Sequence, residues 1–303
     1  MTQATPWCHD REKCPCCEHR AMTHVFSSND RFFNRNKIYD FLECPSCRCL
    51  ILFPQNGNWN PEEAYPDNYP AYATEPLRWY HRVFSWYCFP KLPQKNPMPI
   101  WEIGAGTGLY WEYLSRKYAE VFGIEMDAHA VQSAEKLGRR LRVGAWESFD
   151  PGEGSVGALV MNQVIEHLTA KPDEVFAKSY RILKPGGFWC FRTPNADSWG
   201  RRRFNEFWHP LETPRHTVIY SPGAVKALAG RTGFEFYSIR YTGRAYDLTQ
   251  SAYYLSRDGK HRMILLNKGI PLDFCARLAA IWFNLRRQGD SLEILLRKPG
   301  KLS

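Results

Sequence analysis

A glycine-rich turn constrains the fold of this chain more than any other feature. Residues 101–114 read WEIGAGTGLYWEYL, so an apolar stretch meets three glycines within five positions and then an amphipathic stretch. Gly104, Gly106 and Gly108 remove side chains where a strand turns sharply into a helix, or where a ligand approaches the backbone. Dinucleotide-binding turns favour G-x-G-x-x-G, but here the third glycine comes one residue early and Leu109 follows. The spacing argues against NAD, and a purely structural turn stays open.

The segments after the turn alternate between strand and helix patterns. A short apolar strand at 121–124 ends at Glu125, where a carboxylate can accept both hydroxyls of a ribose. Further strands are expected at 141–145, 158–162, 188–193, 234–239 and over SLEILLRK, with helices at 128–138 and 171–183 and a turn at LKPGG. This alternation predicts an α/β fold with a doubly wound, mostly parallel sheet of seven strands, whose ligands bind at the carboxyl ends of the strands.

Composition narrows the class of protein without naming a partner. The 303 residues are 44% hydrophobic and 15% aromatic, which supports a packed core and argues against disorder. The first residues lack a basic start followed by an apolar run, so no secretion signal is expected. No uncharged apolar stretch is long enough to span a bilayer. The formal charge of +9 suits phosphate, nucleic acid or an anionic membrane surface, and equally a basic soluble enzyme.

Cysteines cluster near the N-terminus. Six of the ten lie between Cys14 and Cys49, and four of these form two C-x-x-C pairs, in CPCC and CPSC. Four thiolates satisfy a tetrahedral zinc ion, so we predict a small zinc ribbon with a closed, structural site. Its ligands are Cys14, Cys17, Cys44 and Cys47. A redox dithiol or a group of free thiols is the alternative, and Cys16, Cys49, His19 or His24 could replace a ligand. Thiols and a missing secretion signal together predict a reducing, cytoplasmic location.

The predicted organisation has three parts. Residues 1–55 form the zinc-ribbon-like domain, and 56–97 form a linker rich in Tyr and Pro with a short aromatic helix at 77–89. Residues 98–303 form the α/β domain, with a helical insertion at about 245–289. The linker tyrosines at 65, 69 and 72 either pack the linker or lie over a ligand pocket.

A family resemblance rests on four motifs in order. WEIGAGTG, GIEMD, NQVIEHL and LKPGG resemble the successive motifs of class I S-adenosylmethionine-dependent methyltransferases. The resemblance implies a Rossmann-like fold that binds S-adenosylmethionine, with Glu102 near the methionine end and Glu125 on the ribose hydroxyls. The implied cofactor residues are Glu102, Gly104, Gly106, Gly108, Glu125, Met126, Trp146, Asn162 and Gln163. Trp146 would border the adenine beside Ala145 and Glu147, or it belongs to the core.

The resemblance extends over nearly the whole chain. A two-knuckle cysteine segment, a tyrosine-rich linker and the segment at 193–222 are similar to bacterial methyltransferases of sugar and polysaccharide biosynthesis. Two departures matter. Relatives usually carry Phe-Asp ahead of the fourth strand, where this chain has Val156-Gly157. Some quinone-modifying relatives have a Glu that could help hold a metal where this chain has Gln163, so Glu166 and His167 are expected to shape the pocket rather than bind metal.

Basic and aromatic residues follow the fifth strand. Arg201, Arg202, Arg203, Trp208 and Arg215 are the predicted substrate-binding residues, because guanidinium groups grip phosphate and rings stack on bases. A solvated basic loop is the alternative. An acceptor hydroxyl also needs a proton acceptor, and His216 and His167 are the candidates. The expected partner is a small-molecule acceptor, such as a nucleotide sugar or a lipid-linked sugar.

Rival interpretations stay open. An RNA-modifying methyltransferase would explain zinc and basic charge, but no RNA-binding module is visible, so nucleic acid is disfavoured. A non-catalytic S-adenosylmethionine-binding protein would be expected to lose the glycines or Glu125, which this chain keeps. Residues 271–290 predict an amphipathic helix with Arg277, Arg286 and Arg287 near its polar side. Packing against the domain is favoured over peripheral membrane contact, and the oligomeric state is not predicted.

Overall fold

The chain divides into two compact units. The computed structural model describes residues 12–54, 64–65, 77–79, 81, 89–93, 97–258 and 272–300. Unit 1 comprises Met1–Ala64, Thr193–Leu228 and Ile239–Glu293, and unit 2 comprises Tyr65–Arg192, Ala229–Ser238 and Ile294–Ser303. The boundaries of these two units differ from those of the three predicted domains, which were placed at residues 55 and 97. The three-domain division stays a prediction. Most of the predicted linker and its helix at 77–89 lies outside the described residues.

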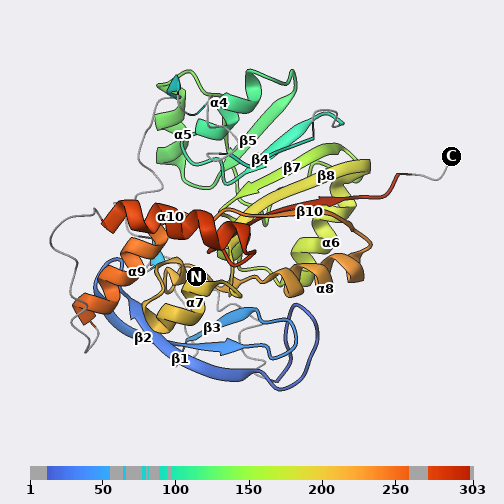
Figure 1. Cartoon of the computed structure of the whole chain (residues 1–303). Coiled ribbons are helices and arrows are strands. Elements are labelled where there is room, and N and C mark those ends of the chain that lie inside the picture. The colour runs from blue at the N-terminus through green and yellow to red at the C-terminus, as the bar shows by residue number, and fades with distance from the viewer. Residues whose placement is uncertain are drawn as a thin grey trace. The chain divides into compact units, whose positions relative to one another are not determined.

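A seven-stranded sheet contains the glycine turn (Figure 1). Its strands are β4 (Ile100–Ile103), β5 (Val121–Glu125), β6 (Arg142–Val143), β7 (Val156–Asn162), β8 (Leu183–Pro194), β10 (Glu235–Tyr241) and β11 (Ser291–Arg297). The order is β10-β11-β8-β7-β4-β5-β6. Strand β4 pairs in parallel with β5 and β7, β5 with β6, and β7 with β8. The predicted α/β fold with a mostly parallel sheet of seven strands is confirmed.

The position of β4 between β5 and β7 defines where a ligand can bind. The chain runs from β4 outward to β5 and β6, and later returns to the other side of β4 with β7. In open α/β sheets a crevice opens at such a reversal, at the carboxyl ends of the strands. The turn after β4, the end of β5 and the end of β7 therefore meet at one edge of the sheet.

Helices join these strands. They are α4 (Leu109–Ser115), α5 (Ala128–Glu135) and α6 (Pro172–Ile182), with a 3-10 turn η2 (Ile165–His167) after β7. Asp127 caps α5 by accepting the N–H of Ala130 at 2.7 Å. Helix α5 ends three residues before the predicted position, ahead of Gly138, whose φ of +73° takes the chain out of the helix. Between β7 and β8 the pairing skips from Val156↔Leu183 to Ala158↔Phe188, so the predicted LKPGG turn interrupts the ladder.

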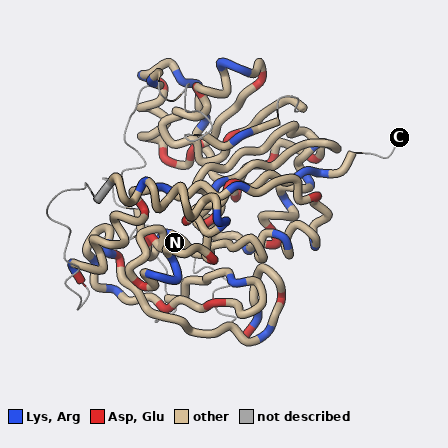
Figure 2. Tube along the Cα trace, viewed as in Figure 1, with Lys and Arg blue, Asp and Glu red and all other residues tan. Residues whose placement is uncertain are grey.

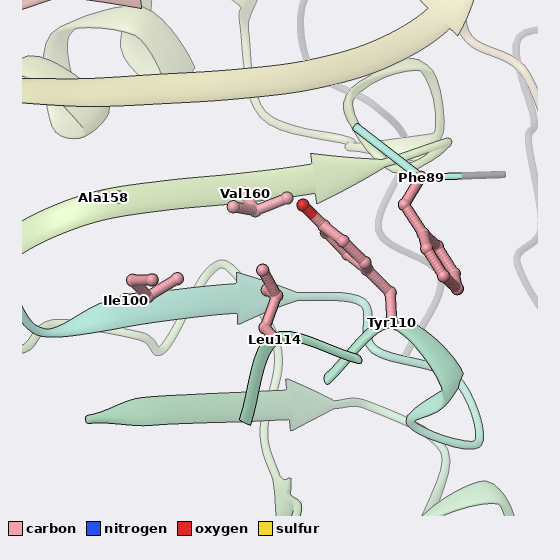
Figure 3. Close-up of a cluster of buried hydrophobic side chains, with 6 residues drawn as sticks. All are labelled: Phe89, Ile100, Tyr110, Leu114, Ala158 and Val160. Carbon is pink, nitrogen blue, oxygen red and sulfur yellow. The ribbon is translucent and has the colours of Figure 1, made fainter. Parts of the chain in front are cut away.

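A buried apolar cluster holds α4 against β4 and β7 (Figure 3). Its members are Phe89, Ile100, Tyr110, Leu114, Ala158 and Val160. The rings of Phe89 and Tyr110 stack with centroids 5.0 Å apart, and the Tyr110 hydroxyl donates to the Pro90 carbonyl at 2.7 Å. Because α4 begins directly after the glycine turn, this packing fixes the helix end of that turn.

The unusual Val156-Gly157 pair lies where two backbones meet. Gly157 N donates to the Pro99 carbonyl at 2.8 Å. A Cβ at position 157 would lie 2.0 Å from the Pro97 carbonyl oxygen. The start of β7 is therefore anchored by close backbone contact, which only glycine permits.

We expect Gly157→Ala to destabilise the protein by about 1–3 kcal/mol, because its methyl group overlaps a backbone carbonyl that cannot move freely. Gly230→Ala is the matched control, since a Cβ there meets nothing within 4 Å and alanine favours the helix α8 (Pro222–Thr232). Urea unfolding of both variants measures the difference. Equal unfolding midpoints for the two variants would show that the contact at residue 157 carries no constraint.

Unit 1 contains a second, antiparallel sheet. Its strands are β1 (Thr23–Asp30), β2 (Arg35–Glu43), β3 (Leu50–Pro54) and β9 (Val218–Ile219), in the order β1-β2-β3-β9. Strand β1 begins within MTHVF and β2 ends with IYDFLE, two stretches between the cysteine pairs whose residues favour short strands. Strand β3 was not expected from the sequence. Nor was β9, which lies inside the segment assigned to the acceptor and pairs Leu50↔Ile219 and Ile51↔Val218. The N-terminal segment and the segment at 193–222 thus share one sheet.

The helices of unit 1 are α7 (Trp199–Phe204), α9 (Ala245–Asp258) and α10 (Leu272–Leu285), with 3-10 turns η3 (Asn205–Phe207) and η4 (His209–Leu211). Ser221 caps α8 as its sequence predicts, accepting the Ala224 N–H at 3.0 Å. Helix α10 confirms a helix within residues 271–290, but five of its apolar side chains are more than half exposed: Phe274, Leu278, Ile281, Trp282 and Leu285. Packing therefore covers only part of its apolar surface.

Neither the distribution of charged residues nor the hydropathy of the helices marks one surface as a binding site. Basic and acidic residues are interspersed in both units (Figure 2). Among the described helices, none combines the length and the apolar composition that crossing a membrane requires.

Candidate functional site

The glycine turn adopts a backbone that other residues rarely adopt. Gly104, Gly106 and Gly108 have φ of +67°, +54° and +77°. A Cβ at Gly104 would lie 2.5 Å from Cγ2 of Val164, which follows β7. Both the conformation and the space therefore require glycine at position 104. The turn presents its backbone at the carboxyl edge of the sheet.

The carboxylate of Glu125 lies against this turn. Glu125 ends β5, and its Oε2 accepts the Gly106 N–H at 2.8 Å while Oε1 accepts the Asp127 N–H at 3.0 Å. Its side chain is 7% exposed. The structure thus brings together two parts of the predicted cofactor site, and it shows a second role for Glu125 in holding the turn.

Glu102 lies in β4, beside Gly123 of β5 and Val160 of β7 in the ladder. It is 3% exposed, and within the described part of the chain its Oε2 has no hydrogen-bond partner. Burial, and then the charge of Glu125, raise the pKa of Glu102 well above its usual range. A buried carboxyl oxygen with unused acceptor capacity suits a positively charged ligand group.

We expect Glu102→Gln to stabilise the ligand-free protein at pH 8 by roughly 1–3 kcal/mol. This is the cost of burying a charged group whose hydrogen bonds are incomplete. The pKa of Glu102 is higher in the folded protein than its ordinary value of 4.5. The native protein therefore becomes less stable as the pH rises above that value, and the stability advantage of the variant should vanish near pH 4. Urea unfolding at both pH values measures this. The exposed Glu120→Gln is the control, and an advantage that is the same at pH 4 and pH 8 would contradict the assignment.

The remaining predicted cofactor residues lie in unit 2 with different exposures. Asn162 ends β7, and Gln163 follows with a φ of +58° and an N–H that donates to the Arg192 carbonyl at 3.0 Å. Met126 is 70% exposed. Trp146 is 3% exposed, and the Lys178 ammonium lies 4.5 Å from its ring centroid. Most of the Trp146 surface therefore packs against protein, and its contact with adenine stays a prediction.

His167 has a partner that the sequence analysis did not assign. It ends η2, and its Nδ1 lies 2.8 Å from the Tyr65 hydroxyl. The neighbouring Glu166 is fully buried. Tyr65 is one of the linker tyrosines, and this contact favours a role for it beside a candidate base. Tyr69 and Tyr72 lie outside the described residues.

The predicted substrate-binding arginines belong to unit 1, and two of them are buried. Arg215 is 0% exposed and forms two hydrogen bonds to the Asp30 carboxylate, at 2.9 and 3.1 Å. Arg201 pairs with Glu43 of β2. These ion pairs attach the segment after β8 to β1 and β2. Arg202 and Arg203 are exposed, and Arg202 pairs with Asp197 at 2.7 Å.

Trp208 and His216 are buried in the same unit. The indole N–H of Trp208 donates to Oδ1 of Asp290 at 3.0 Å. Burial raises the pKa of Asp290 to about 7, although hydrogen bonds from Ser198 and Trp208 lower it. His216 is 3% exposed, and its Nδ1 lies 2.8 Å from the Pro210 carbonyl. Since a carbonyl only accepts, Nδ1 carries the proton and Nε2 is the basic nitrogen of the neutral ring.

A small pocket of about 20 Å³ lies beside Trp208 in unit 1. Its lining includes Arg31, Glu206, Trp208, His209, Glu212 and Tyr254. His209 packs edge-on against Tyr246, with centroids 5.2 Å apart, and burial lowers the pKa of His209. Of the predicted substrate residues, Trp208 lines this pocket. A cavity of this size has room for about one water molecule, so it does not by itself define an acceptor site.

The cysteine pairs converge. The sulfurs of Cys14, Cys17, Cys44 and Cys47 all lie within 4.8 Å of one another. Cys47 N donates to the Cys44 sulfur at 3.4 Å, as in zinc knuckles. Burial raises the pKa of Cys44 to about 11, so a metal ion must displace its proton. The cluster beside the small antiparallel sheet is compatible with the predicted zinc ribbon.

Comparison with known proteins identifies the family. The model of a family described as a methyltransferase domain matches residues 72–239, more than half of the chain. The chain belongs to this methyltransferase domain family, in agreement with the order of its sheet and the glycine turn.

The individual relatives are distant. A ubiquinone biosynthesis O-methyltransferase of Alkalilimnicola ehrlichii is 31% identical over 105 residues, which are 32% of this chain and 42% of that protein. A malonyl-[acyl-carrier protein] O-methyltransferase of Coxiella burnetii is 24% identical over 103 residues, 34% of this chain and 36% of that protein. The chain thus spans less than half the length of these two curated relatives.

A solved structure supports the fold. The complex of a methyltransferase with the methyltransferase activator Trm112 from Haloferax volcanii aligns with a TM-score of 0.51 at 16% identity. The alignment covers 74% of this chain and 91% of that chain. At this identity the likeness concerns the fold alone.

Proposed function

We propose that the protein transfers a methyl group from S-adenosylmethionine to a small acceptor that contains a sugar or a phosphate. The observation that carries the proposal is the Glu125 carboxylate held against Gly106 at the carboxyl edge of the sheet. There it can accept ribose hydroxyls while the glycine backbone lies close to the ligand. The family to which the chain belongs implies the same cofactor.

The residues present fit this cofactor. S-adenosylmethionine carries an ammonium group, and the Oε2 of Glu102, which has no hydrogen-bond partner among the described residues, could accept a hydrogen bond from it. The proposed binding residues are Glu102, Gly104, Gly106, Gly108, Glu125, Met126, Trp146, Asn162 and Gln163. When bound, the cofactor supplies an activated methyl group on a sulfonium. The protein's contribution is to place the acceptor in line with it, so catalysis is mostly positioning.

On the acceptor side, we assign two roles to the basic segment. Arg202 and Arg203 are exposed and can reach an acceptor phosphate. Arg201 and Arg215 instead fix the segment through their ion pairs with Glu43 and Asp30. The two curated relatives are named as O-methyltransferases, which supports an oxygen atom as the methylated position.

An acceptor hydroxyl that received the methyl group would have to give its proton to a base. We propose His216 as the group that takes this proton, at Nε2, because burial lowers its pKa and keeps the ring neutral near pH 7. His167, oriented by Tyr65, is the alternative.

A structural zinc ion completes the proposal. Cys14, Cys17, Cys44 and Cys47 would hold it in tetrahedral geometry, and four protein ligands leave no open position for catalysis. Its role is to join the two cysteine turns from which β1–β3 extend.

We expect Glu125→Ala to weaken S-adenosylmethionine binding by roughly 1.5–3 kcal/mol, because a charged hydrogen-bond partner of the ribose is lost. Calorimetric titration measures it. The exposed Glu135→Ala on α5 is the control. Since Glu125 also holds two backbone N–H groups, Glu125→Gln serves as a second variant that keeps one acceptor. An unchanged dissociation constant in a folded Glu125→Ala protein would remove Glu125 from the site.

The acceptor is identified by incubation with methyl-labelled S-adenosylmethionine and separate pools of nucleotide sugars, lipid-linked sugars and RNA. We expect label in one of the sugar pools. Label confined to RNA would support the RNA-modifying alternative, and cofactor binding with no label in these or wider metabolite pools would support a non-catalytic protein.

A further inference from the structure

Two additional cysteines lie at the four-cysteine cluster. Cys16 and Cys49 are both 0% exposed. The Cys49 sulfur lies 3.5 Å from the Cys14 sulfur and 3.5 Å from the Cys47 sulfur. The sulfurs of Cys14, Cys16 and Cys49 form a second group within 4.8 Å of one another. Cys14 therefore belongs to two groups of potential metal ligands.

The additional thiols come from two turns with the same backbone. Cys14 N donates to the His19 carbonyl at 2.8 Å, and Cys44 N donates to the Cys49 carbonyl at 3.0 Å. The residue that follows the second cysteine of each pair has a positive φ, +62° at Glu18 and +65° at Arg48. Cys16 occupies the third position of the first turn, and Cys49 occupies the sixth position of the second. Each turn thus supplies three sulfurs.

Most of the sulfur–sulfur distances fit two tetrahedra that share the Cys14–Cys47 edge, although Cys47 lies outside the group that Cys14, Cys16 and Cys49 form within 4.8 Å. With zinc–sulfur bonds of about 2.3 Å, the edge of a tetrahedral site is about 3.8 Å. Cys14, Cys47 and Cys49 form a triangle with sides of 3.6, 3.5 and 3.5 Å, which is close to one face of such a tetrahedron. The sulfurs of Cys17 and Cys44, which belong to the first group with Cys14 and Cys47, are 3.5 Å apart.

We propose that the six cysteines hold two metal ions, with Cys14 and Cys47 bridging them. Cys17 and Cys44 complete the first site, and Cys16 and Cys49 complete the second. The inference rests on the metal role proposed above for the first four cysteines. Zinc is the expected ion, because all ligands are thiolates and the geometry is tetrahedral.

Charge balance supports the second ion. One zinc ion with four thiolates leaves two negative charges in excess, and two zinc ions with six thiolates leave the same excess. Binding of the second ion therefore replaces the two thiol protons of Cys16 and Cys49 without adding net charge to a buried cluster. Six thiolates around a single ion would double the excess.

Metal content of the full chain tests the inference. Native mass spectrometry with elemental analysis of zinc-loaded protein should find two ions per chain. The double variant Cys16→Ser/Cys49→Ser should retain one. Cys275→Ser is the control, because Cys275 is an exposed thiol on α10, and it should retain two.

Cadmium-113 substitution gives a second readout. Two resonances, coupled through shared sulfur, are expected from the native protein, and one from the double variant. A single ion in the native protein would overturn the inference and leave the four-cysteine site intact. No ion at all would overturn both proposals. If the double variant does not fold, the native count and the native spectrum decide.

Discussion

Replacing Cys44 with serine should release metal and unfold the antiparallel sheet of unit 1. Structural zinc sites contribute about 10–16 kcal/mol to the folding of small domains, more than the few kcal/mol by which such domains are stable. Cys44 is fully buried, and its sulfur accepts a hydrogen bond from the Cys47 N–H within the second cysteine turn. Serine offers a poor ligand and leaves the other thiols without a complete tetrahedron.

Hydrogen exchange over β2 and β3 measures this effect, together with zinc content. Protection of these strands should fall by several orders of magnitude in Cys44→Ser, and a strong chelator should do the same to the native chain. Cys275→Ser should behave as native. Full protection of β2 and β3 in metal-free protein would show that the cluster does not need an ion to fold.

Removing the His216 imidazole should lower turnover by roughly 10²–10⁴-fold, the usual contribution of a general base. The expected loss is in kcat, because His216 belongs to unit 1 and is not among the proposed cofactor residues. Burial lowers the pKa of His216 below its ordinary 6.5, so native turnover should persist into mildly acidic solution and fall as the ring gains a proton. His216→Ala should lose that acid-side decline.

Two further variants separate this effect from binding. Arg202→Ala should mainly raise the acceptor KM, since the arginine would hold a phosphate and take no part in proton transfer. The exposed His129→Ala should leave both parameters unchanged. If His216→Ala keeps full turnover across the pH range with the identified acceptor, the base is His167 or solvent, and the segment at 193–222 serves binding alone.

The parallel sheet was predictable because its signals are local. A strand, three glycines and a helix start follow one another within fourteen residues, and Glu125 ends the next strand. Such patterns depend on backbone conformation and on alternation of elements, both of which the sequence shows directly. The helix cap at Ser221 and the helix α10 are predictable for the same reason.

The assembly of unit 1 depends on contacts between distant parts of the chain. Arg215 meets Asp30 across 185 positions, and Arg201 meets Glu43 across 158. An arginine beside aromatic residues has the same local pattern whether it binds a ligand phosphate or a buried carboxylate. The pairing of β9 with β3 involves two residues per strand, too few for a recognisable alternation.

Two side-chain contacts in the described structure could not be predicted from the sequence. Asp290, with its pKa raised to about 7, is a single acid in a short turn, and only its burial beneath Trp208 marks it. Tyr65 is one of several linker tyrosines, and its contact with His167 distinguishes it. Asp290 and Tyr65 are distinguished by their burial and by their hydrogen-bond partners. Burial and partners depend on the folded structure and cannot be predicted from the residue type.

Calorimetric titration of the native chain with S-adenosylmethionine, and with NAD under the same conditions, tests the central claim most directly. The position of Glu125 against the glycine turn predicts saturable binding of one S-adenosylmethionine per chain, and the early third glycine, followed by Leu109, predicts no binding of NAD. Binding of NAD without S-adenosylmethionine, or binding of neither by folded protein, would contradict the account.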